Sequence, residues 1–369
     1  MEPITTNDVG PHMGSYVNFV IYAAGLSALL AAYVPFSPFT ADLVSVSREA
    51  RIAIYRARGV LWTVGAAALG LLLVRGLLGD APIHDAGLGG AMVRIGRGIF
   101  GTADPNWLWA AGASAAALIA AYWASYIPFA MTPASGGTLM TAAEAEGVLG
   151  PDDLVLGLVS GSEARAYPRD VIARQAAIAD TVGGRKYTVT YCVLSNSAVA
   201  FLPDIPTRAM RLVPVTTVDN NVLLHDPDTG NFVQQLDGRI VAGPGGGRRL
   251  KTYPVTLASW RDWKGLYPES KVHWAPAATV RDKLVLRLLR TAFSLDRLAQ
   301  RTRPWHRTGT PVDRKLPAMT FVLGVEINGE KVAYPTEPLK QARVVNDKVG
   351  GAQVAVFCDG GPCQVFSRR

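Results

Sequence analysis

The sequence lacks the short motifs that mark many enzyme classes. It contains no nucleophile elbow, no zinc-binding helix motif, no dinucleotide-binding fingerprint and no Walker loop. The glycine-rich run at residues 243–247 is followed by the strand-like segment LKTYPVTL, whereas a phosphate-binding loop needs the start of a helix there. This run therefore predicts a hairpin turn. Because no motif combines a nucleophile, a base and an orienting group, catalytic residues and any cofactor stay unassigned, and a non-enzymatic role is favoured.

Cysteine and histidine are scarce, with three and five residues in a chain of 369. Cys358 and Cys363 flank a Gly-Gly-Pro turn that could bring their two sulfurs together. Three interpretations stay open for Cys192, Cys358 and Cys363: buried thiols, a Cys358–Cys363 disulfide with a structural or redox role, or a metal site. A metal site would need histidine ligands, and none of the histidines shows ligand spacing, so no metal is predicted.

Lysine is absent from residues 1–136, where seven arginines balance seven acidic residues. The formal net charge of +8 therefore belongs to the rest of the chain. Residues 281–315 account for most of it, with ten basic and three acidic residues. No nucleic-acid-binding motif accompanies this basicity, so no nucleic-acid partner is predicted.

Long apolar runs occupy the first third of the chain, at residues 16–34, 59–78 and 107–131. Each approaches or exceeds the roughly 20 residues that a helix needs to cross a bilayer. We therefore expect a three-span transmembrane region within residues 1–136, a multi-pass protein of the cell membrane, and the lipid bilayer as a partner. Buried helices of a soluble domain are the alternative.

Charged residues leave the orientation of these spans open. Arginines between the first two runs weakly favour a cytoplasmic first loop, which would place the domain after the third span in the cytoplasm too. Acidic residues follow the third span, but they count for little in this rule. The arginines of that first loop are Arg48, Arg51, Arg56 and Arg58.

An internal repeat dominates the remainder: residues 155–184 recur as residues 322–351 without a gap. Tyr167 and Asp180 correspond to Tyr334 and Asp347 at a constant offset of 167 (334 − 167 and 347 − 180). With a one-residue slip, Cys192 corresponds to Cys358, so the two cysteines are expected at comparable positions. Such a repeat indicates one supersecondary unit used twice.

The strand and turn signals predict an α+β domain built from two tandem copies of this unit. Short alternating strands are expected at residues 154–159, 164–167, 186–192, 321–327, 331–334 and 352–358, with a helix at 170–179. The Asn-Gly pair at 328–329 predicts a hairpin. The expected divisions are a linker at 137–153, a first unit with a β-rich extension at 154–280, a connector at 281–316 and a second unit at 317–369.

The connector contains a segment with helical periodicity at residues 281–302. On a helical wheel its basic residues fall within an arc of about 80°, and apolar residues occupy most of the opposite side. Three interpretations stay open: a helix lying on an anionic membrane surface, an ordinary surface helix, or a docking face for a partner protein. The basic residues are Lys283, Arg287, Arg290, Arg297 and Arg301.

A family resemblance is carried by GSEARAYP, IADTVGG, TYCVLSNSAVAF, HDPDTGNFVQQLDGRIVAGPGGGRRL, the tryptophans at 260 and 263, and DRKLPAMTFVLGVEINGEKVAYP. On these motifs, residues 154–366 resemble the DUF3179 family, a bacterial domain of unknown function. The resemblance implies a Cys-Pro-Leu-Cys turn, but Ser195 stands where the second cysteine is expected, and only Cys192 carries over. It implies no reaction, substrate or cofactor, and it favours a domain on the exported, periplasmic side.

These patterns favour a membrane-anchored, non-enzymatic module that binds or assembles with other membrane or envelope proteins. The alternative is a thiol-based redox or metal-handling domain that uses Cys192, Cys358 and Cys363. A third class, an enzyme for a small envelope substrate, would need a polar pocket between the two units.

Overall fold

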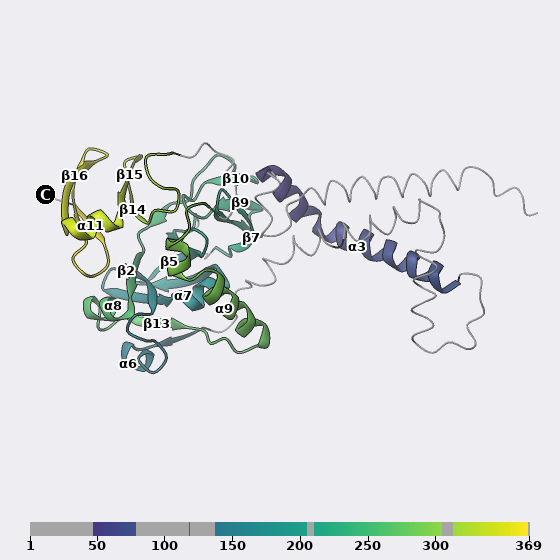
Figure 1. Cartoon of the computed structure of the whole chain (residues 1–369), viewed down its shortest axis with the longest axis horizontal. Helices are drawn as coiled ribbons and strands as arrows, with labels where there is room; N and C mark the ends of the chain where they lie inside the picture. The colour runs from purple at the N-terminus through teal and green to yellow at the C-terminus, as the bar shows by residue number, and fades with distance from the viewer. Residues whose placement is uncertain (1–46, 79–117, 119–136, 205–209, 305–312, 368–369) are drawn as a thin grey trace, which may run out of the picture. The chain divides into compact units, whose positions relative to one another are not determined.

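The computed structural model describes residues 47–78, 118, 137–204, 210–304 and 313–367 (Figure 1). The chain divides into an N-terminal part, residues 1–126, and a C-terminal domain, residues 127–369. The domain is rich in β-strands and carries several short helices, so the α+β prediction is confirmed at this level.

Helix α3 (Arg48–Leu78) is the long described element of the N-terminal part. The Ser47 hydroxyl accepts a hydrogen bond from the Ala50 N–H (3.1 Å) and caps the helix start. The helix therefore begins well before the apolar run at 59–78, and Arg48 to Arg58 lie on its first turns.

Among the described residues, no helix combines the length and the apolar character needed to cross a bilayer. The predicted span at 16–34 lies outside these residues, as does the span at 107–131 apart from Leu118. The side chains of residues 68–78, in the second predicted span, also lie outside them.

The first sheet of the domain, sheet A, has the strand order β1-β13-β3-β2-β12. One of its faces packs on Trp260 and Trp263 of helix α8 (Trp260–Leu266), and the other contributes Leu156, Leu158 and Tyr167 to the main core. Its strands are β1 (Thr138–Met140), β2 (Leu154–Ser160), β3 (Glu163–Pro168), β12 (Thr256–Ser259) and β13 (Lys271–Trp274).

Residues 137–153 are part of the domain, so the linker prediction was wrong. Leu139 of β1 pairs with His273 of β13, a partner more than a hundred residues away in the sequence. Thr141 caps helix α6 (Ala142–Ala145), and its side chain and Glu144 form a capping box. Ala142 and Ala145 are buried against sheet A.

Sheet B and helix α7 (Arg169–Gln175) complete the first unit. The helix is shorter than predicted because Ala176 adopts a left-handed conformation (φ 58°) and the chain continues into β4. Asp180 lies on this strand. Sheet B has the order β11-β6-β5-β4, formed by β4 (Ala177–Val182), β5 (Arg185–Cys192), β6 (Ser197–Phe201) and β11 (Thr252–Tyr253).

Sheet C belongs to the segment that we name the extension, residues 210–250. Leu212, Leu224, Val233 and Leu250 from this segment share one core with side chains of sheet B. The sheet has the order β10-β9-β8-β7, formed by β7 (Val213–Val218), β8 (Asn221–Asp226), β9 (Asn231–Gln234) and β10 (Ile240–Ala242). The glycine-rich run after β10 reverses the chain, as predicted for a hairpin turn.

The second unit has the same order of elements as the first. Hairpin β14–β15 is followed by helix α11, and then by β16, β17 and β18 in a three-stranded sheet. Its own small core contains Leu339, Val356 and Cys358. The bounds are β14 (Val322–Ile327), β15 (Glu330–Pro335), α11 (Thr336–Ala342), β16 (Val344–Val349), β17 (Ala352–Phe357) and β18 (Gln364–Ser367).

Strand registers in the two units match at one offset. Val155 pairs with Pro168, and Val322 pairs with Pro335 (322 − 155 = 167). Ala177 pairs with Thr190, and Val344 pairs with Phe357 (344 − 177 = 167). Only the last strand departs from this offset, because Thr190 pairs with Val199 and Phe357 with Gln364 (364 − 199 = 165). The final turn of the second unit is therefore two residues shorter.

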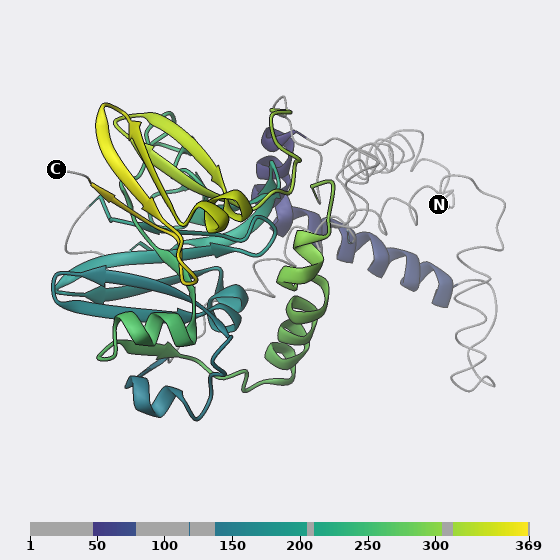
Figure 2. The same cartoon turned by 60° about the vertical axis from the view of Figure 1, so that its left-hand side comes forward.

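The connector forms two helices, α9 (Val280–Ala292) and α10 (Leu295–Ala299), instead of one. Ser294 accepts a hydrogen bond from the Arg297 N–H and starts α10, so the chain breaks after Phe293. The single basic arc predicted over 281–302 was therefore wrong. Figures 1 and 2 show α9 and the second unit on different sides of the domain.

Candidate binding surface

The structure separates the three cysteines. Cys358 and Cys363 form a disulfide beside the core of the second unit. Cys192 is a free thiol buried in the main core. Among the described residues, no group of three or more His, Cys, Asp or Glu side chains could hold a metal ion.

Cys192 and Cys358 do not occupy equivalent positions, so that prediction was wrong. The Tyr191 N–H donates to the Ala176 carbonyl (2.9 Å), and the Cys358 N–H donates to the Arg343 carbonyl (2.7 Å). The offset of 167 thus continues through Cys358, without the assumed slip, and Cys358 replaces Tyr191.

Both units contain a tyrosine–aspartate pair at matching positions. The Tyr167 hydroxyl donates to Asp180 (2.9 Å), and the Tyr334 hydroxyl donates to Asp347 (2.7 Å). Burial and the Asp347 carboxylate raise the pKa of Tyr334 to about 12. The hydrogen bond from Tyr334 lowers the pKa of the Asp347 carboxyl. The pair thus ties the hairpin to the following strand in each unit.

The first unit adds a buried arginine and a histidine to its pair. Arg165 Nε lies 3.6 Å from Asp180, and Val332 stands at the corresponding position of the second unit. Burial lowers the pKa of His273 below its usual 6.5, although the Asp180 carboxylate acts in the opposite direction. The His273 ring lies beside the Tyr167 ring, with 5.8 Å between the ring centroids.

The basic residues predicted for a membrane or partner contact are split between two helices and the chain that follows. Lys283, Arg287 and Arg290 lie on α9, Arg297 lies on α10, and Arg301 follows α10. Arg290 is engaged by Asp170 (2.7 Å), while the side chains of Lys283 and Arg287 are exposed. The apolar side expected opposite these basic residues is only partly buried. Leu289 and Phe293 are buried, whereas Leu284 and Leu288 are exposed.

The second unit leaves open a sheet face that the first unit covers. Phe357 and Phe366 are 41% and 49% exposed, and their rings contact edge to face at 5.5 Å. Val344, the strand partner of Phe357, is 43% exposed. We name these three residues the Phe357 face.

The corresponding first-unit residues are Thr190, Phe201 and Ala177. They are 0%, 0% and 4% exposed. The extension contacts two of them: Gln235 donates to the Thr190 hydroxyl (3.2 Å), and Gly238 lies so close to the Phe201 ring that an added Cβ would come within 3.0 Å of it. Equivalent positions are therefore sealed in one unit and open in the other.

Hairpin β14–β15 is open in the same way. In the first unit the Trp263 ring rests directly on Gly157 and shares a buried cluster with Val155 and Ala166. In the second unit nothing lies within 4 Å of a Cβ placed at Gly324, the position that matches Gly157.

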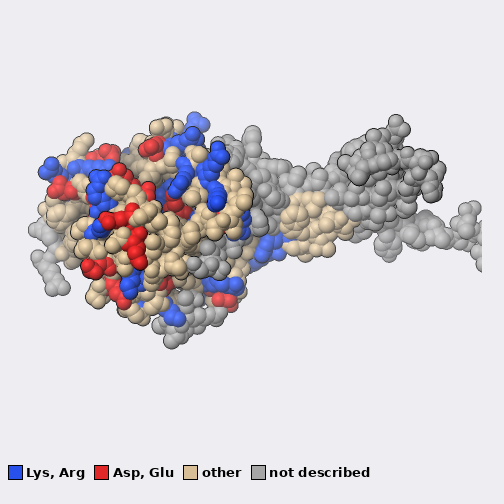
Figure 3. Space-filling model, turned by 90° about the horizontal axis from the view of Figure 1, so that it is seen from below, with Lys and Arg blue, Asp and Glu red and all other residues tan. Residues whose placement is uncertain are grey.

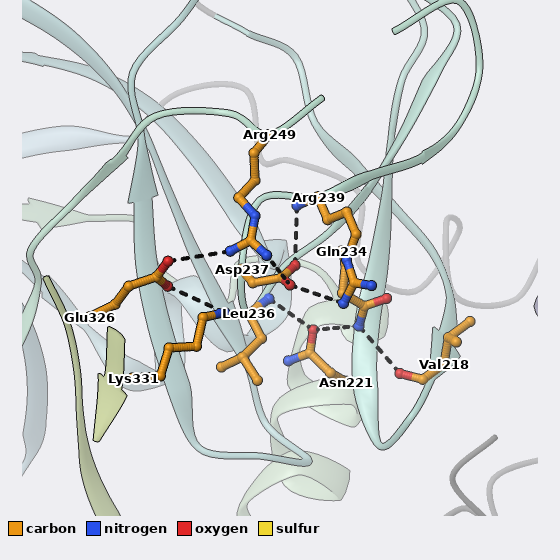
Figure 4. Close-up of polar contacts among 9 residues, drawn as sticks. All are labelled: Val218, Asn221, Gln234, Leu236, Asp237, Arg239, Arg249, Glu326 and Lys331. Atoms are coloured by element: carbon orange, nitrogen blue, oxygen red, sulfur yellow. Dashed lines mark hydrogen bonds and ion pairs between the residues drawn. The ribbon is translucent and has the colours of Figure 1, made fainter. Parts of the chain in front are cut away.

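Ion pairs mark where the second unit meets the extension (Figure 4). Arg249 lies 3.4 Å from Asp237 of the extension and 3.5 Å from Glu326 of β14. Lys331 contacts the same Glu326 at 3.4 Å. The Arg249–Glu326 and Lys331–Glu326 pairs are half-exposed, and surface pairs of this kind contribute about 0–1 kcal/mol each. They therefore add little to the stability of this contact.

The face shown in Figure 3 carries basic and acidic side chains in mixture. A nucleic-acid-binding face would need a broad patch of basic side chains, and the described residues of this view show none.

A family model described as "Protein of unknown function (DUF3179)" matches residues 127–368. The chain belongs to the DUF3179 family. No curated protein and no solved structure matches it. The DUF3179 match includes β1 and α6, in agreement with their packing on sheet A.

Ser195, at the expected second cysteine of the DUF3179 turn, takes part in a partly buried polar network. Its hydroxyl lies 2.8 Å from that of Ser197 and accepts a hydrogen bond from Asn221 (3.0 Å). Asn221 also donates to Gln235 (2.8 Å), which is fully buried. The turn of this DUF3179 domain is thus held by amide and hydroxyl groups.

The Phe357 face was missed in the sequence. A signal was present, because a position-by-position comparison of the repeats shows phenylalanine at 357 where the first unit of this DUF3179 domain has threonine. The exposure of that phenylalanine depends on the extension, which covers this sheet face in the first unit and leaves it open in the second.

Proposed function

We propose that the protein is a membrane-anchored module that binds another polypeptide of the membrane or envelope, without catalysis. The apolar runs at residues 16–34, 59–78 and 107–131 support the anchor. The Cys358–Cys363 disulfide supports an exported, periplasmic domain, because disulfides persist in oxidising compartments.

The two units are proposed to be copies of one ancestral module. Matching registers, matching tyrosine–aspartate pairs and matching left-handed residues after α7 and α11 support this proposal. The first copy then serves as a template for what the second copy can bind.

The observation that carries the binding proposal is the contrast between the open Phe357 face and its covered counterpart. Exposed apolar groups that touch one another mark interaction sites on soluble domains. On the first unit this face is covered by strands and turns of the extension, with Leu250 and the backbone of Gly238 against Phe201. The partner is therefore proposed to be an extended β-type segment that presents small and aliphatic side chains.

Phe357→Ser combined with Phe366→Ser is expected to weaken this binding strongly. Fully burying an exposed phenylalanine contributes about 1.5–3 kcal/mol, and about half of each side chain is still exposed, so losing both weakens binding by roughly 10- to 150-fold. The unfolding midpoint should fall by roughly 3–12 °C without unfolding the domain, because about half of each side chain is buried in it. The measurement is quantitative mass spectrometry of proteins that co-purify with the full chain in mild detergent.

Leu266→Ser is the matched control, because Leu266 is 49% exposed on α8 of the same domain. A protein that co-purifies with the wild type but not with the double variant is then produced separately. It must bind both the wild type and the Leu266→Ser control. Equal binding to the double variant would refute the proposal. A species that proves to be a second copy of the chain would refute the proposed partner class.

The second candidate function is thiol–disulfide exchange, which the Cys358–Cys363 bond favours. A thiolate of an external dithiol would attack Cys363, the more accessible sulfur, and release the Cys358 thiolate. The second thiol of the reductant would then resolve the mixed disulfide, leaving two protein thiols and an oxidised dithiol.

Thiol labelling tests this candidate. The native, unreduced protein is expected to react at none of its three cysteines, and the fully denatured, reduced protein at all three. If the protein exchanges disulfides, brief treatment of the folded protein with a dithiol should make two cysteines, Cys358 and Cys363, available for labelling. The Cys192→Ser variant should give the same two labelled cysteines as the wild type. If the Cys358–Cys363 disulfide resists reduction until the domain unfolds, the exchange function is refuted and the disulfide has a purely structural role.

A further inference from the structure

Helix α9 presents an apolar stripe to solvent. Val280, Leu284 and Leu288 are 85%, 67% and 39% exposed. They recur every four residues, so they lie along one side of the helix. An exposed stripe of large aliphatic side chains on a regular helix indicates a surface that becomes buried elsewhere.

The other side of α9 fixes the helix to the domain. Leu289 and Phe293 are buried in the main core. The Arg169 guanidinium donates to the Phe293 carbonyl, and Arg290 pairs with Asp170 at 2.7 Å. A capping box formed by Thr279 and Asp282 closes the helix start. The stripe is therefore held in a fixed orientation and needs no folding on binding.

Basic side chains flank the stripe. Lys283 and Arg287 are exposed and precede Leu284 and Leu288 by one residue each. Arg297 of α10 is exposed farther along the chain. A row of aliphatic residues bordered by lysine and arginine is typical of helices that lie in the headgroup region of a membrane.

We propose that this face of α9 lies on an anionic lipid surface, with Val280, Leu284 and Leu288 inserted between headgroups. Lys283 and Arg287 would contact lipid phosphates. A lipid surface fits better than a protein because lysine is depleted from the centres of protein interfaces, whereas each basic residue near an anionic bilayer adds about 1 kcal/mol. The contact is independent of the Phe357 face, and it does not depend on the proposed polypeptide partner.

An environment-sensitive fluorophore on Leu284→Cys of the full chain tests this proposal. The native cysteines do not interfere, because Cys192 is buried and the other two are disulfide-bonded. We expect a blue shift in vesicles of phosphatidylcholine mixed with phosphatidylglycerol, and none in phosphatidylcholine alone. Added salt should reverse the shift, because it screens the lipid charge.

Two further variants make the result specific. Lys283→Gln with Arg287→Gln should lower the bound-to-free ratio of the face roughly 30-fold and remove the shift, since two charges contribute about 1 kcal/mol each. The same label on Leu266→Cys should show no shift with either lipid. A missing shift at 284, or one that ignores lipid charge and salt, would overturn the proposal. If the blue shift at position 284 also occurs in lipid-free detergent, and only when a particular protein co-purifies, the α9 face binds that protein and the lipid proposal is refuted.

Discussion

Gly157→Ala is expected to destabilise the domain by about 3 kcal/mol, the upper end of the usual cost of overpacking a core. A Cβ at residue 157 would overlap the six-membered ring of Trp263, which is fully buried. The ring cannot retreat easily, because its indole N–H donates to Ser270 (2.9 Å) and the tilted Tyr267 ring packs on it, with 4.5 Å between the centroids. Chemical denaturation of the domain, followed by tryptophan fluorescence, measures the change.

Gly324→Ala provides the matched control, because Gly324 holds the same register position in the second unit. Nothing lies within 4 Å of its added Cβ, and alanine is favoured over glycine in a strand by about 0.5–1 kcal/mol. The control should therefore be neutral or slightly stabilising. Equal losses for the two variants would mean that the second hairpin is covered as the first one is.

Gln235→Met is expected to cost about 2–4 kcal/mol of unfolding free energy, or roughly 5–15 °C in the unfolding midpoint. The side chain is fully buried between sheets B and C. Its carbonyl accepts from Asn221 (2.8 Å) and Ser197 (2.9 Å), and its amide donates to the Thr190 hydroxyl (3.2 Å). Methionine keeps the volume but leaves these polar groups without their partner. Thermal unfolding monitored by circular dichroism tests this.

Gln175→Met is the control for the same chemical change. Gln175 is also buried, at 3% exposure, but its Nε2 atom has no hydrogen-bond partner in the described part of the chain. Removing a buried, unpaired amide should be neutral or stabilising by about 1 kcal/mol. A loss at 175 as large as that at 235 would show that burial of glutamine, and not the network, decides the effect.

Short-range signals predicted most strands of the domain. The Asn328-Gly329 pair forms the expected tight hairpin, with both residues at positive φ (49° and 84°). Alternating residues in β5 and β17 identified two central strands. These features depend on neighbours in the sequence, so pattern alone could reveal them.

Long-range contacts explain the predictions that were wrong. Residues 137–153 resemble a linker until β13, far along the chain, provides a strand partner for β1. The Cys192–Cys358 equivalence failed because the shortened turn lies after Cys358, a detail that only strand register reveals. The Phe357 face looked like an ordinary strand, because the sequence does not show which unit the extension covers.

A photoreactive phenylalanine analogue placed at Phe357, in the full chain in its own membrane, probes the contrast between the two units most directly. The same analogue at Leu266 reports background. We expect one adduct specific to position 357, formed with an extended segment of a different polypeptide. Adducts that are absent, or identical at both positions, would show that the open face of the second unit is simply solvent-exposed.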